Sequence, residues 1–148
     1  MVKFNKQYEE EESVSLVREA AVAYNTPIKK IQLSRVGIAP DFVVDLMSSY
    51  HFSKVETARL TDISAKTLDR HIQSGKNFTG LQSDRLIDLA DLYMEGLDAF
   101  GSNAKFIQWL NAKTAALGNT TPKSWLDTQR GISLISDQIG RIKHGIFA

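Results

Sequence analysis

The sequence contains no cysteine among its 148 residues. Disulfide bonds and zinc sites built from thiolates are therefore excluded. This absence suits a reducing compartment, and we expect the protein to be cytoplasmic. No apolar run approaches the length that spans a membrane, and the acidic stretch Glu9–Glu12 does not fit a signal peptide. We therefore expect no membrane partner.

The sequence also lacks a strong excess of charge of one sign, because 18 basic and 17 acidic residues leave a net charge of +1. A nearly neutral protein does not bind nucleic acid over a broad surface, so any such binding must use a small local patch. Locally the charge does vary: residues 53–80 carry +2, residues 81–100 carry −4 and residues 101–148 carry +4. We interpret the acidic segment as a solvated helix face.

The alternating pattern of β-strands is missing as well, and almost every periodic stretch repeats at about 3.6 residues. The sequence therefore predicts an all-α fold. A first helix is expected from Ser13 to about Pro27, residues 28–38 fit either a helix or an extended connection, and Pro40 suits the first turn of the next helix. Further helices are predicted after Ser53, Ser64, Ser102 and Thr121, and over about 82–100 and 128–144.

Residues 54–72 fit a helix-turn-helix, because small Ala58 allows two short helices to approach and Ile63 supplies an apolar plug after the turn. In such a motif the start of the second helix meets base edges in the major groove. Arginine suits guanine, while lysine, hydroxyl and helix-end amide groups suit phosphate. The candidate DNA-binding residues are Ser64, Lys66, Thr67, Arg70, Lys54 and Lys76.

Three features also fit a plain helical hairpin. Asp62 occupies the turn position that glycine commonly holds, although aspartate tolerates left-handed backbone geometry. Thr61 lies where an apolar residue is more common, and Asp69 puts a negative charge on the helix expected to face DNA. Binding of operator DNA would separate the two interpretations.

The sequence has no constellation that predicts catalysis, a metal site or a cofactor. Its three histidines, His51, His71 and His144, are scattered and have no partner ligand at helical spacing. No strand-to-helix elbow carries a nucleophilic serine, and no phosphate-binding glycine loop is present. We therefore expect a protein that is not an enzyme.

The last 43 residues are dense in apolar and aromatic side chains and end in a basic, apolar tail. Their motifs are Trp109-Leu-Asn, Ala116-Leu-Gly118, Thr121-Pro122, a long helix with isoleucines at helical spacing, and Gly140-Arg-Ile-Lys-His-Gly-Ile-Phe-Ala148. This block resembles the toxin-binding domain of the Xre/MbcA/ParS antitoxins. The resemblance extends back to about Val36 through Gly37-Ile-Ala-Pro40 and Phe100-Gly101.

The resemblance implies an Xre-like helix-turn-helix domain at 36–100 and a small helical toxin-binding domain at 101–148. Residues 1–35 lie outside the resemblance, and we expect them to form an N-terminal helical extension, to which the sequence assigns no role. It implies a type II antitoxin that binds a cognate toxin, often a RES-domain enzyme that consumes NAD, and that represses its own operon. The tail would contact the toxin through Arg141, Lys143, His144, Gly145, Ile146, Phe147 and Ala148.

Trp109, Trp125 and Ile139 are expected to anchor the core or a subunit interface, because large apolar side chains dominate burial. We expect a homodimer that forms a larger complex with the toxin. A stand-alone repressor, whose C-terminal helices only dimerise, is the alternative, and a scaffold protein with a degenerate helix-turn-helix is the third. A neighbouring toxin gene would favour the first.

Overall fold

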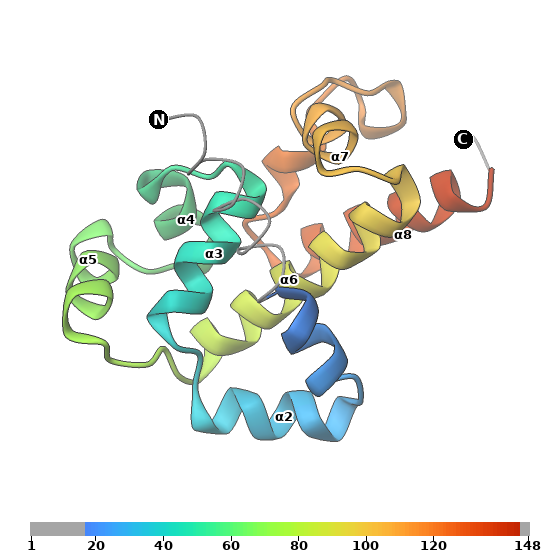
Figure 1. The fold of residues 1–148 in the computed structure, drawn as a ribbon. Coiled ribbons are helices and arrows are strands. Elements are labelled where there is room, and N and C mark those ends of the chain that lie inside the picture. Colours follow the sequence, from blue (N-terminus) through green and yellow to red (C-terminus); the bar gives the residue numbers. More distant parts are fainter. Residues whose placement is uncertain (1–16, 146–148) are drawn as a thin grey trace, which may run out of the picture. The chain divides into compact units, whose positions relative to one another are not determined.

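The computed structural model describes residues 17–145, so the predicted helix start at Ser13 lies outside the described residues. Within that range every regular element is helical, which confirms the all-α prediction (Figure 1). A helical segment at 17–23 comes first. It is followed by α2 (Pro27–Val36), α3 (Pro40–Tyr50), α4 (Lys54–Thr61), α5 (Ala65–Ser74), α6 (Leu81–Phe100), α7 (Asn103–Leu110), the 3-10 turns η1 (Ala115–Leu117) and η2 (Pro122–Trp125), and α8 (Gln129–Lys143).

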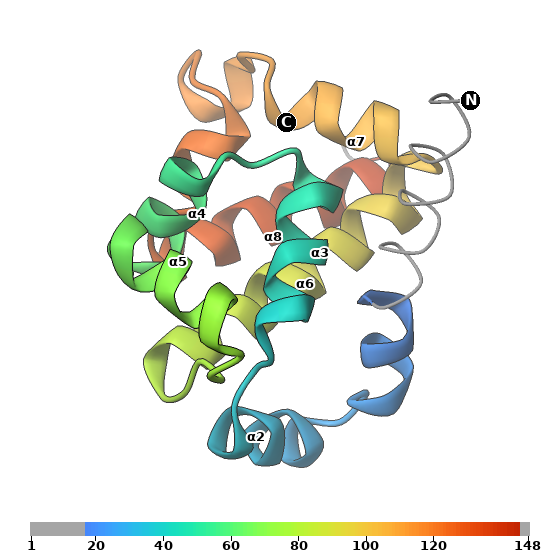
Figure 2. The same ribbon diagram turned by 60° about the vertical axis from the view of Figure 1, so that its left-hand side comes forward.

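The chain forms two compact units, Met1–Ala90 and Asp91–Ala148. In the first unit, α3 and α4 both pack against α5 (Figures 1 and 2). Tyr50, at the end of α3, stacks on Phe52 with ring centroids 4.5 Å apart. Its buried hydroxyl donates a hydrogen bond to the carbonyl oxygen of Leu89. An aromatic anchor with a satisfied hydroxyl thus joins α3 to α6.

The region that the sequence left ambiguous is a helix, α2. Thr26 caps it by accepting a hydrogen bond from the amide of Lys29, and Pro27 occupies the first helical position. The side chains of Ile28, Ile31 and Val36 are between 51% and 72% exposed. A helix is recognised in a sequence by an apolar face that packs into the core. Because α2 has no such face, its sequence did not predict a helix.

The second unit places α7, η2 and α8 beside the end of α6. Its buried side chains include Tyr93, Phe106, Leu110, Leu126, Ile132, Ile135 and Ile139. The segment 112–120 contains the short turn η1 and is closed by a bridge between Thr114 and Thr120. Ser102 caps α7 and Thr128 caps α8, each through its side-chain oxygen.

The acidic segment of α6 was expected to be a solvated face, and Asp84, Glu95 and Asp98 are exposed. Asp88 and Asp91 are only partly exposed. Asp84 accepts a hydrogen bond from Ser34 of α2. In the second unit, Glu95 accepts one from Ser136 at 2.6 Å, and Asp98 pairs with Lys143. The carboxylates therefore attach neighbouring helices to α6.

Two glycines set how closely the helices of the second unit approach. A Cβ atom on Gly96 would lie 2.4 Å from the ring of Phe106, which is fully buried. A Cβ atom on Gly131 would lie 1.7 Å from the carbonyl oxygen of Trp125. Neither distance is compatible with a side chain. At Gly131 the obstacle is backbone, which cannot move aside as a flexible side chain can.

We expect Gly131→Ala to lower the free energy of unfolding by about 3 kcal/mol, because α8 and η2 must separate to admit the methyl group. Gly140→Ala is the matched control in the same helix, since nothing lies within 4 Å of its Cβ position. That change should raise stability by about 0.5–1 kcal/mol, because it removes a flexible glycine from a helix interior. Urea denaturation followed by circular dichroism measures both. Equal stability of the two variants would contradict the close approach.

Candidate functional site

The predicted helix-turn-helix is present as α4, a turn and α5. Ser53 and Glu56 form a complete capping box at the start of α4. Asp62 takes the left-handed conformation in the turn, with φ of 56°, and Ile63 is 5% exposed. Thr61 is buried, and its hydroxyl donates to the carbonyl oxygen of Thr57 at 2.6 Å. The two unusual residues of the turn are therefore accommodated without an unsatisfied polar group.

The start of α5 is held by a chain of hydrogen bonds among three of the predicted DNA-binding residues. Ser64 accepts a bond from the amide of Thr67 at 3.1 Å and donates its hydroxyl proton to the Thr67 hydroxyl oxygen at 2.8 Å. The guanidinium of Arg70 donates to the same Thr67 oxygen at 3.2 Å. Ser64 and Thr67 thus position Arg70, whose side chain is exposed.

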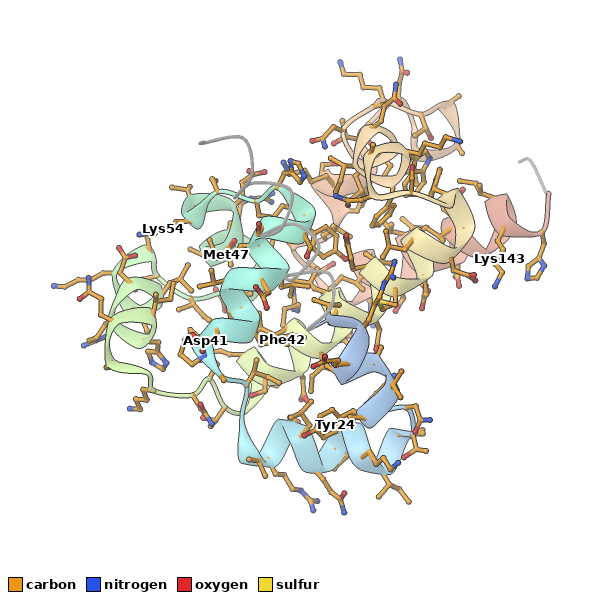
Figure 3. The ribbon with its side chains drawn as sticks, in the orientation of Figure 1. Tyr24, Asp41, Phe42, Met47, Lys54 and Lys143 are labelled. Carbon is orange, nitrogen blue, oxygen red and sulfur yellow. The ribbon has the colours of Figure 1, made fainter. Side chains whose placement is uncertain are left out.

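The other predicted DNA-binding residues are lysines, and all are exposed: Lys54, Lys66 and Lys76. Lys54 begins α4, and its ammonium lies 2.6 Å from the carboxylate of Asp69 in α5 (Figure 3). His71 lies on the opposite side of α5 from this surface. Its ring is half-buried, stacks on Phe78 and has Nδ1 3.1 Å from the carbonyl oxygen of Lys76.

Sequence reasoning missed Gln73 as a member of the exposed face of α5. At 100° per residue, Asp69, Gln73, Lys66 and Arg70 fall within an arc of about 100°, and the buried Leu68 lies outside it. The spacing of Gln73 from Asp69 and Arg70, four and three residues, was the signal that could have found it. Glutamine can read adenine in the major groove. We call Lys66, Asp69, Arg70 and Gln73 the α5 face.

The predicted anchors of the second unit occupy three different environments. Ile139 is 1% exposed and belongs to the core. Trp109 is half-buried and packs against Phe100 and Phe106, with ring centroids 5.3 and 6.4 Å away. Trp125 is 39% exposed, and its indole Nε1 donates to the hydroxyl of Thr120 at 2.7 Å. Of the three side chains, that of Trp125 is the one most accessible to a partner.

The predicted toxin-binding residues lie at the C-terminal end of α8. Arg141, Lys143, His144 and Gly145 are exposed, and Lys143 also pairs with Asp98 (Figure 3). Ile146, Phe147 and Ala148 lie outside the described residues.

The structure adds two residues that the sequence analysis did not name. Arg130 and Leu134 share the outward face of α8 with Arg141, because the three recur at spacings of four and seven. The exposed carboxylate of Asp137 lies on the same face, four residues before Arg141. The inward face of the same helix carries Ile132, Ile135 and Ile139. We call Arg130, Leu134 and Arg141 the α8 face.

In residues 17–145, no three side chains of the kind that bind metal lie close enough to hold an ion. Nor is any helix in that stretch long and apolar enough to cross a membrane.

Comparison with known proteins identifies the family. Residues 96–145 match the Xre/MbcA/ParS antitoxin C-terminal toxin-binding domain. An Antitoxin Xre of Yersinia enterocolitica is 32% identical over 112 residues, which cover 72% of this chain and 76% of that protein. The chain belongs to the Xre/MbcA/ParS family of antitoxins.

An Antitoxin Xre of Photorhabdus laumondii is similar at 31% identity over 109 residues, or 72% of this chain and 74% of that protein. The family is one of antitoxins and not of enzymes. The matched domain includes the end of α6, α7, both 3-10 turns and all of α8. It therefore contains the α8 face and the close approach at Gly131.

Proposed function

We propose that this antitoxin neutralises a RES-domain, NAD-degrading toxin through its second unit and represses its own operon through α5. The match of residues 96–145 to a toxin-binding domain carries the first half of this proposal. The α5 face supports the second half, because it presents Lys66 and Arg70 on the exposed side of the second helix of a helix-turn-helix.

The toxin surface is expected to be acidic around an apolar depression. The α8 face offers two guanidinium groups, Arg130 and Arg141, on either side of Leu134, which is 36% exposed. Asp137 adds one carboxylate between Leu134 and Arg141, so the face keeps a net positive charge of one. Guanidinium groups bind carboxylates and phosphates through paired hydrogen bonds, and a partly exposed leucine contributes apolar area. The segment 101–148 carries a net charge of +4, which favours an anionic partner.

Deleting residues 145–148 or replacing Arg141 by glutamate should each abolish neutralisation of the toxin. The deletion removes Phe147, and loss of an aromatic anchor at an interface commonly costs about 2 kcal/mol or more, about a thirty-fold loss of affinity. Arg141→Glu reverses a charge on the exposed side of α8. Growth on co-expression with the toxin gene adjacent to the antitoxin gene, and the binding affinity of the purified pair, measure both effects.

Lys105→Glu is the control, because it makes the same charge reversal at an exposed position of α7. The deletion should keep the melting temperature of the parent. Arg141→Glu should lower it slightly and Lys105→Glu should raise it slightly, because a negative charge is unfavourable in the last turn of α8 and favourable in the first turn of α7. If the deletion lowered the melting temperature while neutralisation remained complete, the tail would belong to the protein's own core, and its assignment to the toxin would be wrong. A protein that binds operator DNA and no toxin would be a stand-alone repressor.

For the DNA surface, Arg70→Ala should weaken operator binding by about 1–3 kcal/mol and relax sequence preference, because arginine reads guanine through two hydrogen bonds. Lys66→Ala should weaken binding to every sequence alike and reduce the salt dependence by about one unit, because lysine contacts phosphate. Gel shifts at two salt concentrations distinguish the two effects. Unchanged affinity and sequence preference in Arg70→Ala would contradict the assignment of α5.

We propose that the free antitoxin is a homodimer and that the toxin complex is larger, since a helix-turn-helix protein gains affinity by placing two copies on paired half-sites. Ile132, Ile135 and Ile139 of α8 are buried within their own unit, so a second copy must use other surfaces. Light scattering at tens of micromolar should give twice the mass of 16.5 kDa. A folded protein with the mass of one chain would contradict this.

A further inference from the structure

One member of the α5 face has the wrong charge for contact with DNA. Asp69 lies on the same exposed arc as Lys66 and Arg70, and its side chain is 42% exposed. A carboxylate there is repelled by phosphate groups and weakens binding to any duplex. Its partner is Lys54, which stands at the start of α4, and whose side chain is 60% exposed. Lys54 is thereby occupied by an internal anion.

The ion pair between Lys54 and Asp69 can be replaced by contacts of either residue with DNA. Exposed ion pairs are worth at most a factor of about five in an equilibrium constant, so a competing ligand can replace either partner. Lysine is a good ligand for phosphate, and aspartate accepts a hydrogen bond from the amino group of cytosine in the major groove. A duplex with a cytosine opposite Asp69 can satisfy the carboxylate and release Lys54 to the backbone. A duplex without that cytosine cannot.

We propose that Asp69 is a specificity-determining residue, which holds Lys54 as a counter-ion and lowers affinity for every sequence that lacks a cytosine opposite it. This inference rests on the proposed DNA-binding function. It assigns to Asp69 a role opposite in sign to that of Arg70: arginine adds affinity at the right base, whereas aspartate removes affinity at the wrong ones.

The test compares four full-length proteins: the parent, Asp69→Asn, Lys54→Met and the double variant. The probes are a duplex carrying the DNA upstream of the antitoxin's own operon and a random-sequence duplex of equal length, titrated between 50 and 200 mM salt. Asp69→Asn should bind the random duplex about three- to five-fold more tightly and increase the salt dependence by about one unit, because Lys54 then contacts phosphate. The ratio of operator to random affinity should fall.

The double variant shows whether Asp69 acts through Lys54. Lys54→Met should weaken binding to the random duplex in the parent, because it leaves the carboxylate of Asp69 without its counter-ion. In the Asp69→Asn background it should abolish the increase in salt dependence, because no lysine is then freed for a phosphate. Asp62→Asn, which removes the same charge from the turn, should leave the affinity ratio unchanged.

Three outcomes would overturn the inference. If Asp69→Asn increased the salt dependence equally with and without Lys54, the carboxylate would act by simple repulsion. An unchanged ratio of operator to random affinity in Asp69→Asn would mean that it does not set specificity. Absence of binding by all four proteins to both duplexes at 50 mM salt would instead overturn the DNA-binding function itself.

Discussion

The arrangement of the second unit depends on how closely the backbone of α8 approaches that of η2. Gly131 lies where any side chain would meet the carbonyl oxygen of Trp125, so the two segments are in direct backbone contact. This contact, together with the cap from Thr128, fixes the rotation of α8 about its own axis. Once the rotation is fixed, the isoleucines must enter the core, and Arg130, Leu134 and Arg141 must face outward. The outward face of α8 thus follows from the close approach at Gly131 together with the burial of the isoleucines.

The helix-turn-helix is specified by local rules, and for that reason it could be predicted closely. Ser53 and Ser64 cap their helices by bonds that span three residues, and Asp62 turns the chain through its own tolerance of positive φ. None of these features requires knowledge of a distant contact. The same holds for the cap at Ser102 and for Pro122 at the start of η2.

Features that depend on distant contacts were not predictable. The apolar residues of α2 do not form a core-facing stripe, so the sequence could not distinguish a helix from an extended segment there. The contacts of the exposed carboxylates of α6 could not be predicted, because Ser34, Ser136 and Lys143 are about 40 to 50 residues away in the chain. The need for glycine at positions 96 and 131 could not be predicted either, since only the folded structure shows what lies against them.

In the candidate sites, too, features set by nearby residues could be predicted and features set by distant contacts could not. Arg70 and Lys66 could be named from the sequence because the position of a residue along a recognition helix sets its exposure. The hydrogen bonds that link Ser64 through Thr67 to Arg70 could not be predicted from the sequence. The salt bridge between Asp69 and Lys54, which joins two helices, could not be predicted either. A carboxylate on that face looked like evidence against DNA binding when it was read alone. Under the proposed DNA-binding function, pairing with Lys54 makes the cost of this carboxylate depend on the base sequence in the groove. That dependence would help a protein of small net charge to separate one site from many.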